Sequence, residues 1–115
     1  MKRGDVVRAG LPRPAAAPGS EQFGTRPAVI IQNDTAQSIL ATTVIVPMTS
    51  NLQSLRFGGS IPVDPSPENG LTVRSVALCH QLRVIDKRRI ETVLGHLADE
   101  DMRAIESCIR EFLQL

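Results

Sequence analysis

The chain contains the stretch Gly19-Ser20-Glu21-Gln22-Phe23-Gly24-Thr25-Arg26-Pro27-Ala28-Val29-Ile30-Ile31. Its first part is polar and bracketed by glycines, and residues 28–31 form an uninterrupted apolar segment. A small domain rarely places Glu21, Gln22 and Arg26 together where a strand begins unless they hold a ligand there. The stretch therefore predicts a buried strand with a functional loop at its start.

A second strand is predicted over residues 39–48, because β-branched side chains fill positions 42–46. This strand ends in the polar pair Thr49-Ser50. Two polar strand ends in one small domain are typical of an active site. We therefore expect the start of the first strand and the end of the second to form the site together.

Turn-forming residues divide the rest of the chain into short segments. Strands are predicted at residues 5–9, 27–32, 60–63 and 75–84, with a last extended piece at 93–97. Loops or turns are predicted at residues 10–25, 33–34, 51–59 and 64–70, and a single helical turn at 86–90. Pro62 cannot donate to a ladder, so residues 60–63 are expected at a sheet edge.

Near the C-terminus the spacing of apolar residues becomes that of an α-helix. One apolar stripe is formed there by Met102, Ile105, Ile109 and Phe112. Acidic residues at positions 99–101 suit the first turn of a helix. Burial of Ile109 and Phe112 is expected to stabilise the domain by roughly 1.5–3 kcal/mol each. The fold class is therefore mainly β (a β-rich α+β fold), a small antiparallel barrel covered by a C-terminal amphipathic helix.

Length and composition limit the possibilities. The chain has 115 residues and a net charge of +1, which predicts one domain over residues 1–115 and excludes a grossly basic nucleic-acid coat protein. No apolar run approaches the roughly 20 residues that span a bilayer, and the polar start does not resemble a signal peptide. Cys79 and Cys108 are expected to be free thiols, which together predict a cytoplasmic location.

The sequence contains no motif for a metal site, a phosphate-binding loop or a nucleophilic active site. His80 and His96 lie apart, no Cys-x-x-Cys occurs, and no glycine-rich phosphate loop or nucleophile elbow is present. No metal or other cofactor is therefore expected. RNA is a substrate that brings its own nucleophile, the 2′-hydroxyl, so that the protein need only move protons and stabilise phosphorane charge.

Five blocks of the sequence occur in an order that resembles a known family. These are Arg3-Gly4-Asp5-Val6, Gly19-Ser20-Glu21-Gln22, Arg26 to Asp34, Pro47-Met48-Thr49-Ser50 and Gln81 to Lys87, followed by the amphipathic helix. The whole chain is similar to the MazF/PemK toxins of bacterial toxin–antitoxin modules. The resemblance implies a homodimeric SH3-like barrel that cleaves single-stranded RNA without metal, leaves 2′,3′-cyclic phosphate and 5′-hydroxyl ends, and is neutralised by an acidic antitoxin.

The resemblance also implies which residues act. Arg26 would stabilise the phosphorane, Thr49 would hydrogen-bond the scissile phosphate, and Glu21 would orient the arginine or act as base. His80 stands where the family usually has an acidic residue, so it is a further candidate for proton transfer. Residues expected to contact RNA are Ser20, Gln22, Ser50, Arg56, Phe57 and Gln81.

Structural explanations exist beside the functional ones. Arg26 could be a surface arginine paired with Glu21, Thr49 a strand-end residue that caps backbone groups, and His80 a half-buried strand histidine. Phe57 could stack on a base or cover the mouth of the barrel.

Two rival functions follow from the same fold. The chain could be a barrel that binds RNA or protein without cleaving it. A gyrase-poisoning toxin is disfavoured, because that class relies on a C-terminal tryptophan and this chain has no Trp.

Overall fold

The computed structural model describes residues 1–13, 22–56 and 58–115. Its strands are β1 (Asp5–Leu11), β2 (Gly24–Ile30), β3 (Thr42–Thr49), β4 (Ser60–Val63), β5 (Ser75–Leu78), β6 (Arg83–Asp86) and β7 (Ile90–His96). Its helices are the short α1 (Asp34–Gln37) and the long α2 (Asp99–Leu113). Turns of 3₁₀-helix lie at Leu52–Arg56, Cys79–Gln81 and Lys87–Arg89.

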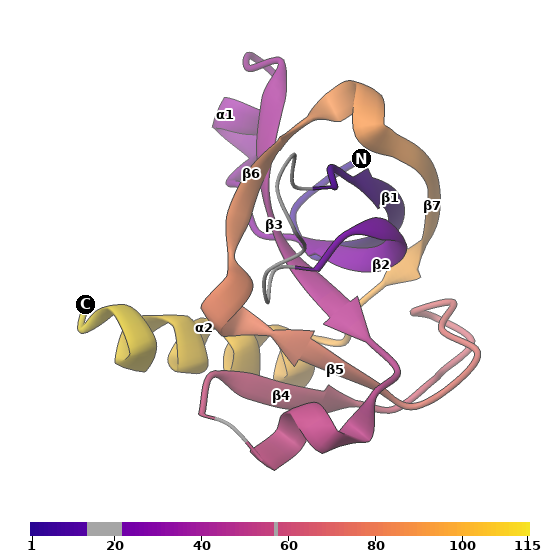
Figure 1. Ribbon diagram of the computed structural model, residues 1–115. Coiled ribbons are helices and arrows are strands. Elements are labelled where there is room, and N and C mark those ends of the chain that lie inside the picture. The colour runs from indigo at the N-terminus through magenta and orange to yellow at the C-terminus, as the bar shows by residue number, and fades with distance from the viewer. Residues whose placement is uncertain (14–21, 57) are drawn as a thin grey trace.

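All strand pairs in the described part of the chain are antiparallel, in the order β4-β5-β3-β2-β1-β7, and β6 pairs with β3. The sheet curls strongly, so that β6 and β7 pass around β1 and β2 in Figure 1. No ladder among these strands joins β6 to β7, so the pairing is that of an open, curled sheet. The expectation of a mainly β fold with a C-terminal helix is confirmed.

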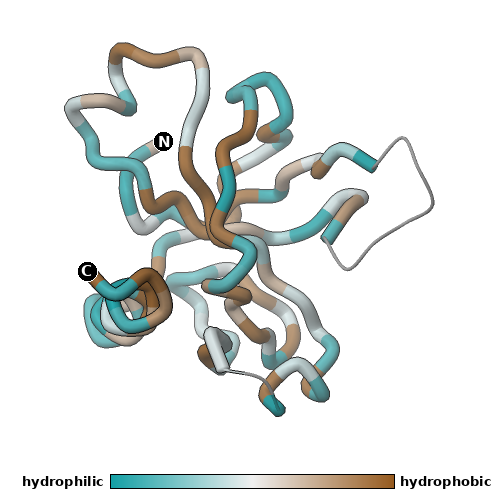
Figure 2. The backbone as a smooth tube through the Cα atoms, turned by 60° about the vertical axis from the view of Figure 1, so that its left-hand side comes forward, coloured by the Kyte–Doolittle hydropathy of each residue, from teal (hydrophilic) through white to brown (hydrophobic). Residues whose placement is uncertain are grey.

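Both faces of the central strands are buried. Val6, Val29 and Val46 belong to one apolar cluster with α2, whereas Val7 and Ile45 belong to a second cluster inside the curl. Successive side chains of a strand point to opposite faces, which explains why these strands read as continuous apolar runs. Figure 2 shows the hydrophobic segments converging at the centre of the molecule.

Helix α2 covers the first of these clusters. Its buried residues are Met102 and Ile105, and Ile109 packs against the same cluster. Arg3 Nη2 lies 2.6 Å from Glu106 Oε2 and so ties the N-terminal segment to the helix. The expected burial of Phe112 is wrong: this side chain is 52% exposed, and Ile109 is the last described residue of the helix that packs against the cluster.

The strand expected at residues 75–84 is also wrong as a single element. Strand β3 pairs with β5 near its end and with β6 near its beginning, and the register differs by three residues between the two ladders. The 3₁₀ turn Cys79–Gln81 takes up this difference and separates β5 from β6. Two short strands therefore replace one long strand.

Other boundaries differ by less. The strand expected from residue 39 begins only at Thr42, so the segment from Ile39 to Ala41 lies outside β3. Asn33 caps α1 by accepting a hydrogen bond from Ala36 N at 2.8 Å, and residues 39–41 connect the end of this helix to the strand. The edge strand at residues 60–63 is confirmed as β4 at the end of the sheet, and Lys87–Arg89 form the expected single helical turn.

Cys79 and Cys108 are both free thiols, as expected. Cys79 is buried in the cluster beneath α2, and Cys108 packs against that cluster. Within the described residues, no helix is long and apolar enough to cross a membrane.

Candidate functional site

The start of β2 and the end of β3 lie side by side. Their ladder pairs Ala28 with Pro47 and Ile30 with Ile45. The same register, continued toward the start of β2, brings Arg26 opposite Thr49. Beyond Pro47, however, β3 pairs with β5 instead of β2. The two strands therefore part next to Arg26 and Thr49, and an opening forms between them.

Residues from both sides of this opening line a cavity of about 280 Å³, which we call the strand-end cavity. Its lining residues are Arg8, Thr25, Arg26, Pro27, Met48, Thr49, Ser50, Gly70, Leu71, Thr72, Val73, Ser75 and Leu94. Among the described residues, two arginines and several hydroxyl side chains line it, and no Asp or Glu does. Such a lining suits an anionic ligand better than a cation.

The two central side chains are held by backbone groups. Arg26 Nε donates to the carbonyl oxygen of Phe23 at 3.0 Å, which fixes the stem of a half-buried side chain. The Thr49 side chain is buried, and its Oγ1 accepts a hydrogen bond from Asn51 N at 3.1 Å. A hydroxyl that accepts this bond can still donate its proton to a ligand. Both groups are therefore oriented before any ligand arrives.

Two of the expected RNA-binding residues, Gln22 and Gln81, are hydrogen-bonded to each other. Gln22 N donates to Gln81 Oε1 at 2.8 Å, and Arg83 Nη2 donates to the same oxygen at 3.3 Å. These bonds attach the end of the first loop to the turn that separates β5 from β6. Gln22 and Gln81 are thus brought together, although neither lines the strand-end cavity.

The structure places the other expected site residues in different surroundings. Ser50 is exposed at the strand-end cavity, whereas Arg56 is exposed at the end of the 3₁₀ turn Leu52–Arg56 and does not line it. His80 lies beside α2: its Nδ1 is 3.2 Å from the Gly59 carbonyl oxygen, and its ring centroid is 6.1 Å from that of Phe112. Ser20, Glu21 and Phe57 fall outside the described residues.

Sequence reasoning missed several lining residues. Leu71, Thr72 and Leu94 come from the β4–β5 connection and from β7, and no local pattern marks them as neighbours of Arg26. Arg8 did leave a signal, because it is an exposed charge between the fully buried Val7 and Ala9. An isolated cation on an otherwise apolar strand could have been weighed as a site residue.

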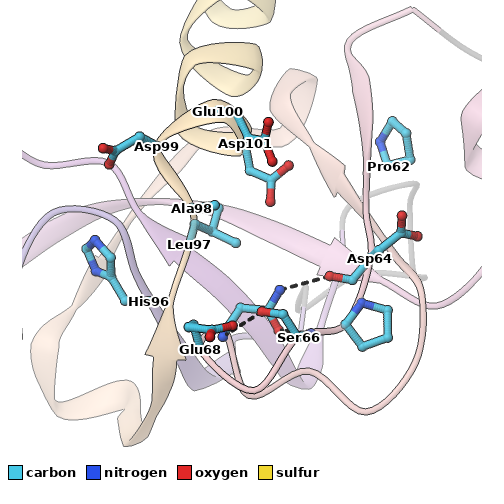
Figure 3. A pocket seen from close by; sticks show the side chains of 12 residues that line it. Pro62, Asp64, Ser66, Glu68, His96, Leu97, Ala98, Asp99, Glu100 and Asp101 are labelled. Carbon is cyan, nitrogen blue, oxygen red and sulfur yellow. Dashed lines mark hydrogen bonds between the residues drawn. The ribbon is translucent and has the colours of Figure 1, made fainter.

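A larger cavity of about 680 Å³ lies between the start of α2, the end of β7 and the segment after β4. Figure 3 shows acidic side chains around it, among them Asp64, Glu68 and Asp101. Burial, with smaller contributions from Glu100 and Asp64, raises the pKa of Asp101 above its usual range. So much negative charge disfavours a nucleic-acid ligand. The strand-end cavity is therefore the better candidate site.

No group of three His, Cys, Asp or Glu side chains in residues 1–13, 22–56 and 58–115 lies close enough to hold a metal ion. The described residues that line the strand-end cavity offer guanidinium and hydroxyl groups, which can hydrogen-bond to phosphate oxygens and stabilise negative charge.

The chain is similar to known proteins over nearly its whole length. The model of the family described as "PemK-like, MazF-like toxin of type II toxin-antitoxin system" matches residues 2–113. The chain is 35% identical over 95% of its length to "Endoribonuclease MazF" of Staphylococcus saprophyticus, covering 88% of that protein. It is 34% identical over its full length to "Endoribonuclease EndoA" of Bacillus subtilis, covering 96% of that protein.

Solved structures with the same fold include MazF from Deinococcus radiodurans, with a TM-score of 0.80, 20% identity and coverage of 100% of this chain and 97% of that one. A mycobacterial endoribonuclease in complex with its cognate antitoxin gives a TM-score of 0.76 at 21% identity, covering 100% of this chain and 96% of that one. At such identities the likeness shows the fold alone.

Proposed function

Because the chain belongs to the PemK-like, MazF-like toxin family of type II toxin–antitoxin systems, we propose that it is a toxin that cleaves single-stranded RNA sequence-specifically. Two relatives above 30% identity are named endoribonucleases. The observation that supports the proposal beyond the family is that Arg26 and Thr49 line the same cavity, which has no carboxylate among its described lining residues.

The proposed reaction needs no nucleophile from the protein. The 2′-oxygen of the nucleotide before the cut attacks the adjacent phosphorus and forms a P–O2′ bond, while the P–O5′ bond breaks. The proton of the 2′-hydroxyl passes to a base, and a proton is delivered to the leaving 5′-oxygen. The products are a 2′,3′-cyclic phosphate and a 5′-hydroxyl end.

In this proposal Arg26 binds the non-bridging oxygens as negative charge builds on the phosphorane, and it delivers the proton to the 5′-oxygen. Thr49 donates its hydroxyl to the scissile phosphate. Glu21 orients Arg26 or takes the 2′-proton; it lies outside the described residues. His80 contacts Gly59 and Phe112 instead of lining the cavity, so its part in proton transfer stays a prediction.

RNA would extend from the strand-end cavity, which Ser50 lines, toward the hydrogen-bonded pair Gln22 and Gln81. The chain would act in the cytoplasm as a homodimer. A cognate antitoxin with an acidic, disordered tail would neutralise it. This tail would fold on binding to the surface that otherwise binds RNA. A mycobacterial endoribonuclease of this fold is known in complex with its cognate antitoxin, which supports the expected partner class.

The test is a cleavage assay on single-stranded RNA in excess EDTA, comparing the wild-type protein with Arg26→Ala. Loss of one preorganised cation is expected to lower the rate about 100-fold or more. Arg103→Ala is the matched control, because Arg103 is an exposed arginine on α2 that does not line the strand-end cavity. Circular dichroism melting checks that each variant is folded.

Three results would count against the proposal. Full activity of a folded Arg26→Ala protein would remove Arg26 from the mechanism. Dependence of cleavage on added Mg²⁺ or Mn²⁺ would show that the site had been misread. Binding of RNA without cleavage by the wild-type protein would favour the rival function of a non-catalytic RNA-binding domain.

A further inference from the structure

Arg8 is a second cation at the strand-end cavity that the proposed mechanism does not use. It lies in β1, its side chain is exposed, and it lines the cavity together with Arg26. Among the described residues it has no hydrogen bond or ion pair that would occupy its guanidinium. We propose that the strand-end cavity holds one nucleotide next to the cleaved bond, and that Arg8 binds the phosphate of that nucleotide. This inference rests on the proposed function.

The sheet register separates the roles of the two arginines. Arg8 lies opposite Pro27 of β2 and Thr92 of β7, whereas Arg26 lies opposite the buried Ala9. Neighbouring residues of a strand point to opposite faces, and directly paired residues share a face. Arg8 and Arg26 therefore leave the β1–β2 ladder on opposite faces. Because the two side chains start from opposite faces of the ladder and both residues line the cavity, we assign Arg8 to a phosphate that neighbours the one bound by Arg26.

The size of the strand-end cavity limits what it can hold. Its volume of about 280 Å³ is near the lower end of ligand pockets, which begin at roughly 300 Å³. This space suits a single nucleotide and is too small for a folded chain. The apolar lining from Met48, Leu71 and Leu94 offers a surface for a base, and hydroxyl groups offer partners for sugar and phosphate.

Charge favours an anion at this place. Glu91 Oε2 lies 3.4 Å from the hydroxyl of the lining residue Thr25, but Glu91 itself does not line the strand-end cavity. Arginine forks bind phosphate bidentately, which lysine cannot do. An arginine that has no hydrogen-bond or ion-pair partner among the described residues, at a cavity whose described lining holds no acid, is well suited to an RNA phosphate.

The test uses a single-stranded RNA that carries one 2′-deoxy substitution at the mapped cut site, so that it binds without being cleaved. Its affinity is measured across a salt series for the wild-type protein, Arg8→Gln, Arg8→Lys and Arg103→Gln. Each phosphate contact contributes about −0.7 to the slope of log K against log salt for single strands. Arg8→Gln is expected to bind about 10- to 100-fold more weakly and to lose about 0.7 from the slope.

Arg8→Lys keeps the charge, so it should keep the slope while losing part of the affinity through the lost bidentate geometry. Arg103→Gln has the same net charge as Arg8→Gln and should bind as the wild-type protein does. On cleavable RNA, Arg8→Gln should raise KM and leave kcat nearly unchanged, because a flanking phosphate is bound equally in the ground state and the transition state.

The outcomes separate the two proposals. If the wild-type protein cleaves RNA but Arg8→Gln matches Arg103→Gln in slope and KM, the role of Arg8 is refuted and the proposed function stands. If Arg8→Gln lowers kcat as strongly as Arg26→Ala, Arg8 belongs to the catalytic step and the flanking site is refuted. If the wild-type protein neither binds nor cleaves RNA, both proposals fail. A melting temperature equal to that of the wild type shows that a weak Arg8→Gln variant is folded.

Discussion

Arg26 and Thr49 are held in place before RNA binds. Arg26 is anchored by the Phe23 carbonyl and Thr49 by the Asn51 amide, and both anchors are backbone groups within three residues in the sequence. Groups that are locked by their own surroundings lose little freedom when the transition state forms, which makes their interactions with developing charge effective. The two residues therefore need no large movement to act together.

At the same scale, the two thiols are expected to differ in reactivity. Cys79 is 3% exposed, and burial, together with the neighbouring Cys108 thiol, raises its pKa to about 12. Alkylation requires the thiolate. Iodoacetamide at pH 8 should thus modify Cys108 in the folded protein and leave Cys79 unmodified until the chain unfolds. Peptide mass spectrometry measures both sites, and a Cys108→Ala protein should stay unlabelled.

The raised pKa of Cys79 also predicts a pH dependence of stability. The thiol of the unfolded chain ionises near its usual pKa of 9.0, whereas the folded protein keeps it protonated up to about 12. Because the folded pKa is the higher one, this contribution to the free energy of unfolding is complete below pH 9.0 and is lost as pH rises toward 12. In Cys79→Ala the free energy of unfolding should not show this part of the decrease with pH. The same pH dependence in Cys79→Ala and the wild-type protein would contradict the raised pKa of Cys79.

At the scale of elements, the turn after β4 is fixed against β7 at Gly70. This residue has a φ of +69°, and a Cβ added there would lie 2.1 Å from the carbonyl oxygen of Leu94. We expect Gly70→Ala to lower the free energy of unfolding by at least about 2 kcal/mol, since strain and a backbone clash combine. Urea unfolding followed by circular dichroism gives the value.

Gly24→Ala is the matched control for Gly70→Ala. Gly24 also has a positive φ, +83°, but an added Cβ would meet no atom of the described residues within 4 Å. Its cost is expected to be about 1 kcal/mol, from backbone conformation alone. Equal effects of the two substitutions would show that the turn moves freely away from β7, against the close approach described above.

Helix α2 offers a second comparison of this kind. Ile105 is fully buried in the cluster that α2 covers, whereas Phe112 is 52% exposed near the end of the same helix. Ile105→Ala should destabilise the protein by about 2–5 kcal/mol, because it leaves a cavity in a packed core. Phe112→Ala, measured in the same denaturant titration, should lower the free energy of unfolding much less. A larger destabilisation by Phe112→Ala than by Ile105→Ala would mean that α2 packs on the sheet with a different face.

At the scale of the whole molecule, the expected assembly is a homodimer. Beside α2, Gly58, Gly59 and Ile61 line a hollow of about 570 Å³ together with the half-exposed Phe112. Exposed apolar side chains such as Phe112 can mark a protein–protein contact, and Ser60, Ser107 and Glu111 add polar groups to the lining of this hollow. Sedimentation equilibrium at micromolar concentration should give twice the 12.5 kDa mass of one chain, and a species of 12.5 kDa alone would contradict the dimer.

Much of this protein was determined by the sequence itself. Apolar and β-branched runs predicted the strands around Val29 and Val46, and the stripe at Met102 and Ile105 predicted α2, because these patterns arise from neighbours within a few residues. The polar motifs around Arg26 and Thr49 indicated the family, which the comparisons confirmed. Their individual roles stay predictions.

Other features were decided only by the tertiary structure. The strand at residues 75–84 is broken because β3 exchanges one partner for another, and Arg8, Thr72 and Leu94 meet at the strand-end cavity because distant strands pair in one register. The exposure of Phe112 likewise depends on where the cluster beneath α2 ends. Local propensity fixes the conformation of a segment, but its partners are selected by the burial of the whole core, and no window of a few residues contains that information.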